Sequence, residues 1–319
     1  MDILRIKLMT MHGYGRFLWT IYWGILCAIG FTSCVDSKTN RIIPLREQLY
    51  AIVDAAPGTV GVAFISDTDT VTINNGVHYP MMSVFKLHQA LAVADKTGAQ
   101  GTSIDSILHV SKDELDVETW SPMLKIYGVA DFDISIRDLI KYSLTASDNN
   151  ASNILFNRVV SPSATDAFIR SVAKDSNFRI VYSEAEMKNN HALSYLNYST
   201  PLSAASLMSQ VFDSTFSHVT AVDSIRKDLT TVTTGQDRLG AIILEHPELC
   251  FAHKTGSGYR SEAGELIAHN DVGYFRLPDG RTYALAVFIR DFNGSEADAS
   301  QIIAGVSQKV YDYMTDVAR

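Results

Sequence analysis

Strand-forming sequence lies near both ends of this chain, and a long segment with helical periodicity separates the two groups. Near the beginning, Val60–Ile65 and Val71–Ile73 are β-branched runs joined by a short polar turn, which predicts a hairpin. Residues 83–231 follow helical periodicity. Strand-like segments return at 250–253, 267–276 and 283–289. Because single strands and isolated hairpins are unstable, we expect one sheet built from both ends of the chain.

This order of segments predicts two subdomains. Residues 35–80 and 220–319 are expected to form an α/β subdomain, and residues 81–219 an all-α subdomain inserted into it. The first helix is predicted over Leu45–Ala55, after a polar linker that contains Pro44. A final helix, residues 296–314, is expected to close the chain.

Residues 1–34 have the pattern of an export signal. A basic flank precedes Phe17–Phe31, an apolar run that is shorter than the roughly 20 residues needed to span a bilayer. The run ends in Thr32-Ser33-Cys34, which is similar to a lipoprotein processing box, so Cys34 is a candidate for lipidation. The prediction is a periplasmic protein, free or anchored by a lipid at Cys34; an uncleaved signal anchor is the alternative.

Composition excludes several classes of protein. With 46% hydrophobic and 19% charged residues in 319, the chain has the composition of a folded protein. Its net charge of −8 argues against nucleic-acid binding, which needs a basic face. Three cysteines cannot form a disulfide framework. We find no patch that suggests a protein partner and therefore expect a monomer.

A serine and a lysine stand one helical turn apart at the start of an apolar helix. Ser83 and Lys86 share one helix face, and the helix N-terminus at Ser83 favours a developing negative charge. A lysine whose pKa is lowered can accept the proton of a serine nucleophile. The spacing is weak evidence alone, because Ser171-x-x-Lys174 and Ser224-x-x-Lys227 repeat it and are interpreted as solvated helix faces.

Two further strings strengthen the interpretation of Ser83. Ser147-Asp148-Asn149 follows a predicted helix, and Lys254-Thr255-Gly256 lies on a predicted strand. A serine acyl-transfer site divided between two subdomains requires this order. The three motifs together are the signature of class A β-lactamases and penicillin-binding proteins.

The resemblance extends over nearly the whole chain after residue 34. The strings that carry it are YPMMSVFKLHQAL, TWSPMLK, LTASDNNASNILF, TTGQDR, AHKTGSGY and AHNDV. They resemble class A serine β-lactamases, and most of all the cephalosporin-hydrolysing branch of the Bacteroides group. The resemblance implies a β-lactamase/transpeptidase-like fold of the α/β plus all-α class, with an antiparallel sheet flanked by helices and an inserted helical subdomain.

The resemblance also assigns catalytic roles. It implies that Ser83 is the nucleophile and that Lys86 accepts its proton or supports it electrostatically. Ser147, linked to Lys86 and Lys254, would pass a proton to the departing ring nitrogen. Glu184 would be the base for deacylation.

The family pattern for this last residue is imperfect. Glu184 takes the position of the family's glutamate, while Glu186 is a rival candidate two residues on. Lys188 stands where asparagine is common, which leaves open how the hydrolytic water is held.

The resemblance implies further residues that bind substrate. These are Trp120, Asn149, Arg238, Lys254, Thr255, Gly256 and Ser257. Asn149 would hold the amide side chain of the substrate. Its carboxylate would be bound by Lys254, Thr255 and Ser257, with Arg238 adding a second positive charge. Backbone N–H groups of Ser83 and Ser257 would form the oxyanion hole. Trp120 would border the cleft, with an ordinary core tryptophan as the alternative. Asp148 and Asp271 are interpreted as structural.

The function implied is hydrolysis of the β-lactam ring of antibiotics, cephalosporins and penicillins, with resistance as the consequence. No metal or organic cofactor is implied, and His88, His253 and His269 lack the spacing of metal ligands. Two alternatives remain from the residues alone. One is a penicillin-binding DD-peptidase acting on peptidoglycan, and the other is a non-catalytic surface lipoprotein.

Overall fold

The computed structural model describes residues 39–216, 219 and 221–316. The predicted export signal over residues 1–34, with Cys34, lies outside the described residues. The described residues from Arg46 on form one compact unit, and the beginning of helix α2 (Thr39–Asp54), up to Leu45, belongs to another. Within the described part of the chain, no helix has both the length and the apolar character that a bilayer crossing requires.

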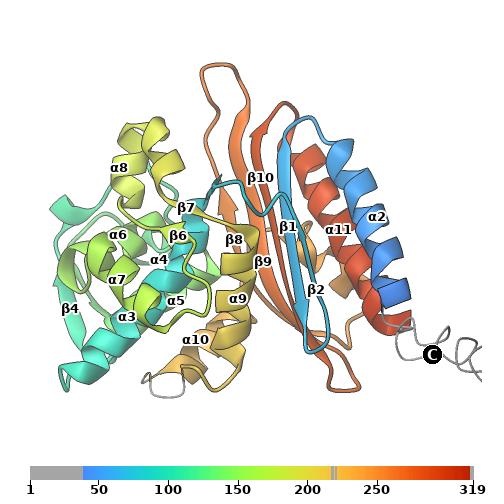
Figure 1. Ribbon diagram of the computed structural model, residues 1–319. Coiled ribbons are helices and arrows are strands. Elements are labelled where there is room, and N and C mark those ends of the chain that lie inside the picture. The colour runs from blue at the N-terminus through green and yellow to red at the C-terminus, as the bar shows by residue number, and fades with distance from the viewer. Residues whose placement is uncertain (1–38, 217–218, 220, 317–319) are drawn as a thin grey trace, which may run out of the picture. The chain divides into compact units, whose positions relative to one another are not determined.

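Strands from both ends of the chain form one five-stranded antiparallel sheet, as the sequence predicts. Its order is β2-β1-β10-β9-β8. The strands are β1 (Thr59–Ser66), β2 (Thr70–Ile73), β8 (Cys250–Ser257), β9 (Leu266–Arg276) and β10 (Thr282–Phe292). The predicted hairpin is β1–β2, and β8 is an edge strand. In Figure 1 the blue strands β1 and β2 lie beside the orange and red strands from the end of the chain.

Helices cover both faces of this sheet. Helix α9 (Pro201–Phe212) packs on β1, β9 and β10, and α11 (Glu296–Asp316) packs on β9 and β10 from the other side (Figure 1). Because both faces are covered, the central strands β9 and β10 are buried along most of their length, without polar–apolar alternation. Ile52, in the part of α2 that follows Leu45, lies close to Gly305 of α11.

The start of α2 corrects the sequence analysis. The expected linker with Pro44 is helical from Thr39, and Pro44 lies within the helix. Pro44 can forfeit only the hydrogen bond to residue 40, because it has no N–H group to donate. This loss falls within the first two turns of the helix, so the helix tolerates it.

The inserted segment is built around the buried helix α3 (Phe85–Ala99), which continues a short 3₁₀ turn, η1 (Met82–Val84). The surrounding helices are α4 (Leu124–Tyr127), α5 (Ile136–Thr145), α6 (Asn149–Arg158), α7 (Pro162–Val172), α8 (Glu184–Asn189) and α10 (Val222–Leu229). Further 3₁₀ turns are η2 (Lys112–Glu114), η3 (His191–Leu196) and η4 (Leu239–Leu244).

Two small sheets interrupt the helices, where the sequence analysis expects helices alone. One pairs β4 (Ile107–Val110) with β5 (Phe132–Ser135). The other has the order β3-β7-β6, from β3 (Tyr79–Pro80), β7 (Tyr198–Ser199) and β6 (Phe178–Arg179). These strands have two to four residues each, which is too short for hydrophobic periodicity to identify them.

Candidate active site

Ser83 lies in the 3₁₀ turn that leads into α3, where the first N–H groups of a helix have no partner within the helix. Gly256 on the edge strand β8 lets that strand approach this turn closely. A Cβ atom at Gly256 would collide with the carbonyl oxygen of Met81 and stand 3.1 Å from a methyl group of Val84. Glycine is therefore required at position 256 because β8 packs closely against the turn that carries Ser83.

Ser83, Lys86 and Glu184 meet in one cluster, although 101 residues separate the first from the last. The Ser83 hydroxyl donates a hydrogen bond of 2.7 Å to Oε1 of Glu184. The Nζ atom of Lys86 lies 3.0 Å from the same oxygen. Lys86 is fully buried and Glu184 is 3% exposed, so the ion pair is shielded from solvent. A buried carboxylate that contacts a serine hydroxyl can accept its proton.

The capping of α8 decides which glutamate faces Ser83. Ser183 is the N-cap of α8, and its hydroxyl accepts from the backbone N–H of Glu186. In turn, the Glu186 carboxylate accepts a hydrogen bond of 2.8 Å from the Ser183 N–H, and Glu186 is exposed. Glu186 is thus occupied by the capping box, whereas Glu184, in the first turn, points to Ser83. The structure brings Glu184, and not its rival, to the nucleophile candidate.

Lys86 is held from three sides. Besides Glu184, its ammonium donates to the Ser147 carbonyl oxygen at 2.8 Å and to Oδ1 of Asn149 at 2.7 Å. Burial lowers the pKa of Lys86, against the opposing effect of Glu184. A lysine with a lowered pKa takes and releases protons more readily near neutral pH.

Ser147 occupies the opposite side of the cluster, in a left-handed backbone conformation with φ 55°. Lys254 Nζ lies 3.0 Å from the Ser147 hydroxyl, and burial followed by the charge of Lys86 lowers the Lys254 pKa well below its usual range. The expected link to both lysines needs one correction, since Lys86 contacts the Ser147 backbone carbonyl and not its hydroxyl. The Ser147 backbone conformation turns that carbonyl toward α3.

Asp148 anchors the segment that carries Ser147. Its buried carboxylate accepts from the Ser121 hydroxyl at 2.9 and 3.0 Å, from the Met123 N–H at 2.8 Å and from the Ala151 N–H at 2.9 Å. The last of these bonds caps α6. Asp148 therefore joins α4 to α6 beneath the site, which agrees with the structural role expected from the sequence.

We expect Asp148→Ala to destabilise the fold by roughly 3–5 kcal/mol, because it leaves two buried N–H groups and a hydroxyl without acceptors. Urea denaturation would measure the loss. As a matched control, Asp133→Ala removes an exposed carboxylate paired with His109 and should change the free energy of unfolding far less. Equal losses in the two variants would contradict the anchoring role.

The candidate substrate residues surround an open cavity of about 700 Å³. The predicted residues that line it are Ser83, Trp120, Ser147, Asn149, Glu184, Arg238, Thr255 and Ser257. Lys86, Lys254 and Gly256 lie behind this wall. Trp120 is 59% exposed, with its indole N–H bonded to the Ala146 carbonyl at 2.9 Å, so the alternative of a core tryptophan is wrong.

Arg238 is a buried residue in the wall of this cavity. Its guanidinium donates to the Asn270 carbonyl oxygen at 2.8 Å and to the Ser257 hydroxyl at 2.7 Å. Burial lowers the pKa of Arg238, and the charge of Asp271 opposes this effect. Beside it, the hydroxyls of Thr255 and Thr234 lie 2.6 Å apart. The arrangement is suited to binding an anion.

Several lining residues escape the sequence analysis. They are Met82, Glu118, Thr119, Thr233, Thr234, Gly235, Tyr259 and Glu296. Thr119 accepts from the Asn149 amide at 2.9 Å and so fixes that side chain. Tyr259 stacks on His191 with ring centroids 3.9 Å apart, and burial raises its pKa to about 12. Glu118 and Glu296 lie outside the strings that carry the family resemblance, whereas the other six lie within them.

Lys188, the departure from the family pattern, also lines the cavity. Its ammonium lies 2.6 Å from Oδ2 of Asp116, and this hydrogen bond is the main cause of a lowered Asp116 pKa. The pair connects α8 to the segment before Trp120. Lys188 thus braces the helix that carries Glu184. In the described part of the chain, no group of three or more His, Cys, Asp or Glu side chains is placed to hold a metal ion.

The comparisons with known proteins agree on one family. The model of the "Beta-lactamase enzyme family" matches residues 44–314. The chain is 45% identical over 271 residues to a "Beta-lactamase" of Phocaeicola vulgatus, covering 85% of this chain and 84% of that protein. It is 32% identical to the "Extended-spectrum beta-lactamase PER-1" of Pseudomonas aeruginosa, covering 90% and 92% of the two chains.

Solved structures are similar along most of their length. A class A beta-lactamase from Bacteroides cellulosilyticus superposes with a TM-score of 0.79 at 31% identity, covering 85% of this chain and 97% of that one. The TLA-3 extended-spectrum beta-lactamase superposes with a TM-score of 0.80 at 31% identity, covering 85% and 98%. The fold expected from the resemblance is therefore confirmed.

Proposed function

The chain belongs to the beta-lactamase enzyme family, in its class A branch, and from this premise we propose that it hydrolyses β-lactam antibiotics through an acyl-enzyme on Ser83. The observation that carries the proposal is the contact of 2.7 Å between the Ser83 hydroxyl and Glu184, with Lys86 on the same carboxylate oxygen. A serine with a buried proton acceptor, at the wall of an open cavity, is suited to acyl transfer.

Acylation begins when Ser83 Oγ attacks the lactam carbonyl carbon. The serine proton passes to the Glu184–Lys86 pair, and the C–N bond of the ring breaks as the nitrogen gains a proton from Ser147. Lys254, 3.0 Å from that hydroxyl, supports the proton transfer. The proton taken from Ser83 then passes through Lys86 and Lys254 to Ser147 and replaces the one given to the nitrogen, so that Glu184 is again an ionised carboxylate. The product of this half-reaction is an ester between Ser83 and the opened ring.

Two backbone N–H groups stabilise the oxyanion that forms on the carbonyl oxygen. One belongs to Ser83, in the first turn of its helix. The other belongs to Ser257. Since Gly258 N donates to Ala268 O of β9, the alternation of an antiparallel ladder turns the Ser257 N–H away from β9. Because β8 is the edge strand, that N–H faces the cavity side. Each such donor contributes about 3–4 kcal/mol of transition-state stabilisation.

Deacylation returns the enzyme to its starting state. A water molecule attacks the ester carbon while Glu184 accepts its proton, and Ser83 leaves with a proton supplied by the same carboxylate. Lys188, through Asp116, keeps α8 and therefore Glu184 in place. Asn149 is proposed to bind the substrate amide and Trp120 to form the exposed lip of the cleft.

The test is to follow hydrolysis of a chromogenic cephalosporin and of benzylpenicillin, together with intact-protein mass. Multiple turnovers with a transient adduct on Ser83 support the proposal. A wild-type protein that keeps the adduct for hours would instead be a penicillin-binding peptidase. Absence of both turnover and adduct would indicate a non-catalytic binding protein.

Arg238 is proposed to bind the substrate carboxylate, with Lys254, Thr255 and Ser257. We expect Arg238→Gln to raise KM for a cephalosporin roughly 10- to 100-fold, because hydrogen bonds to charged groups are worth about 1.5–3 kcal/mol. The control is the methyl ester of the same cephalosporin, which lacks the anion. Its KM should change little, and an equal rise for acid and ester would contradict the assignment.

Export and organisation complete the proposal. We propose that the export signal within residues 1–34 is cleaved and that the protein is located in the periplasm. If the cleavage falls before Cys34, a lipid on Cys34 anchors the mature protein to the membrane. The mature protein is proposed to act as a monomer, with residues 35–80 and 220–319 as one subdomain and residues 81–219 as the other. Resistance to β-lactams would be the consequence for the host cell.

A further inference from the structure

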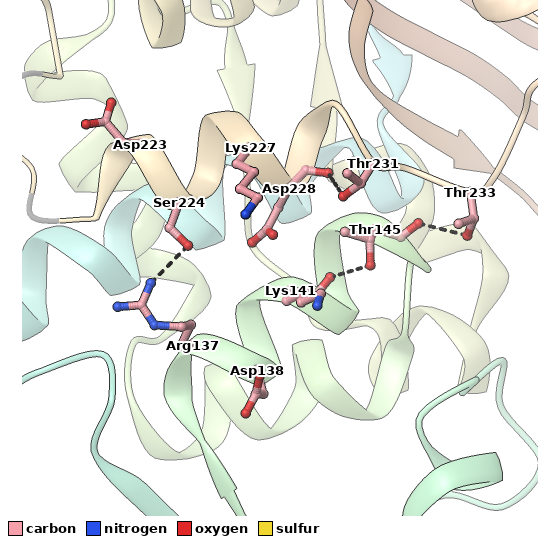
Figure 2. Close-up of a pocket in the computed structure, with 10 residues that line it drawn as sticks. All are labelled: Arg137, Asp138, Lys141, Thr145, Asp223, Ser224, Lys227, Asp228, Thr231 and Thr233. Atoms are coloured by element: carbon pink, nitrogen blue, oxygen red, sulfur yellow. Dashed lines mark hydrogen bonds between the residues drawn. The ribbon is translucent and has the colours of Figure 1, made fainter.

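A second cavity, of about 750 Å³, opens between helices α5 and α10. Figure 2 shows the side chains that line it. Of the residues around the two cavities, Thr233 alone belongs to both. The two cavities are thus separate sites on either side of Thr233. The catalytic mechanism uses none of the charged side chains of this second cavity.

Asp228 is the unusual residue of this second cavity. It is only 7% exposed, and its Oδ2 atom is buried without a hydrogen-bond partner among the described residues. Its charged neighbours are Arg137, Lys141, Lys227 and Asp138. Native proteins rarely leave a buried carboxylate oxygen unsatisfied, because desolvation without a partner costs stability. Because Asp228 lines the cavity, this oxygen can accept a hydrogen bond from a molecule bound there.

The cations near Asp228 form no ion pair with it. Lys141 and Lys227 are exposed and have no ion-pair partner in the described part of the chain. Figure 2 draws their ammonium groups on either side of the Asp228 carboxylate. Arg137 is bound to Asp105 at 2.6 Å and to the Ser224 hydroxyl at 3.1 Å, and Asp138 caps α5 with Ser135. The unpaired charges are thus one buried anion and two exposed cations.

The hydroxyl groups add acceptors beside the buried carboxylate. Thr145, Thr231 and Thr233 donate their hydroxyl protons to backbone carbonyl oxygens, at 2.8, 3.0 and 3.1 Å. Only their lone pairs remain for another molecule. The inner part of the cavity therefore accepts hydrogen bonds, while its rim carries positive charge.

We propose that this cavity binds a small zwitterion, of the size of an amino acid or dipeptide, with its ammonium on Asp228 and its carboxylate on Lys141 and Lys227. The ammonium supplies the donors that the inner acceptors lack. The carboxylate meets the two unpaired lysines at the rim. The string Ser224-x-x-Lys227, interpreted from the sequence as a solvated helix face, forms part of this wall.

The test measures binding of glycylglycine by chemical-shift perturbation in two-dimensional NMR spectra of the full protein. Two blocked dipeptides separate the contributions of the charged ends: N-acetyl-glycylglycine has no ammonium, and glycylglycine amide has no carboxylate. We expect glycylglycine to bind at least tenfold more tightly than either, with shifts on α5 and α10. No binding, or equal binding of glycylglycine and the acetylated peptide, would overturn the proposal.

Variants locate the site. Asp228→Asn should weaken glycylglycine at least tenfold while leaving N-acetyl-glycylglycine unchanged, and Lys141→Met with Lys227→Met should weaken both peptides that carry a carboxylate. The matched control is Asp223→Asn, an exposed carboxylate on the same wall that is already paired with Arg226. An equal effect of Asp223→Asn and Asp228→Asn would overturn the assignment to the buried oxygen.

The ionisation of Asp228 provides an independent check that the variant folds. Burial raises its pKa to about 6, opposed by Lys141, Arg137 and Lys227 and reinforced by Asp138. A raised pKa means that the folded state favours the protonated acid, so ionisation above pH 6 lowers stability. Asp228→Asn should therefore raise the melting temperature at pH 7.5 more than at pH 4.5. Glycylglycine binding to wild type should weaken as pH falls below 6, and binding that strengthens there would contradict an ionised Asp228.

Discussion

Glu184→Gln is expected to stop the reaction at the acyl-enzyme. Deacylation should fall about 10³-fold, within the range that general-base catalysis contributes. Acylation should be affected less, because Lys86 remains beside Ser83's turn with its bonds to Ser147 and Asn149. Glutamine keeps the size of the side chain but cannot take a proton from water.

The measurement combines turnover with intact-protein mass after mixing with one cephalosporin. The variant should accumulate an adduct that maps to Ser83 and persists after substrate is removed. Glu186→Gln is the matched control, because Glu186 lies two residues away and is engaged only with the N-cap Ser183. It should turn over like wild type. Normal turnover by Glu184→Gln together with adduct accumulation in Glu186→Gln would reverse the assignment.

The position of Glu184 could be predicted from the sequence only through family resemblance. The physical reason for the choice of Glu184 over Glu186 is the capping box at Ser183, and the letters Ser-Glu-Ala-Glu already contain it. The sequence does not indicate that Glu184 contacts Ser83, 101 positions away, because this contact depends on how α8 packs against α6. The resemblance supplies the two candidates, the capping box distinguishes them, and tertiary packing brings Glu184 to Ser83.

The architecture was predictable for a related reason. Strand patterns at both ends of the chain are strong, because β9 and β10 are buried and rich in apolar residues. The short pairs β4–β5 and β3–β7–β6 have two to four residues each and depend on partners distant in sequence. The start of α2 differs from the sequence prediction because proline disfavours a helix interior, whereas Pro44 costs only one hydrogen bond near the helix start.

The burial of Asp228 in the second cavity could not be predicted from the sequence. Asp228 follows Lys227 in an amphipathic helix, and such a residue is normally solvated. Its burial comes from the packing of α10 against α5, which connects residues about 90 positions apart. The hydrophobic periodicity of α10 does not indicate that Asp228 is buried toward α5 with a carboxylate oxygen that has no hydrogen-bond partner among the described residues.

Ser83→Ala is expected to abolish hydrolysis, with a loss of roughly 10⁶-fold in kcat, because no other nucleophile faces the lactam carbonyl in the proposed mechanism. No adduct should be detected by mass after incubation with penicillin. The chain offers a matched control in Ser171→Ala, since Ser171 also precedes a lysine by three residues. Ser171 is exposed and Lys174 is paired with Asp213, so this variant should retain wild-type turnover.

The double variant Ser83→Ala/Glu184→Gln tests whether the two residues act as one unit. Glu184 works only on the proton of Ser83 and on the water that attacks the Ser83 ester, so it has nothing to catalyse once the hydroxyl is gone. The double variant should therefore be no slower than Ser83→Ala alone, although the single losses would multiply to about 10⁹ if they were independent. A further loss in the double variant would mean that Glu184 also activates water directly on the lactam, without an acyl-enzyme. Intact mass and thermal melting of all three variants would show that the folded protein, and not its unfolding, gives the result.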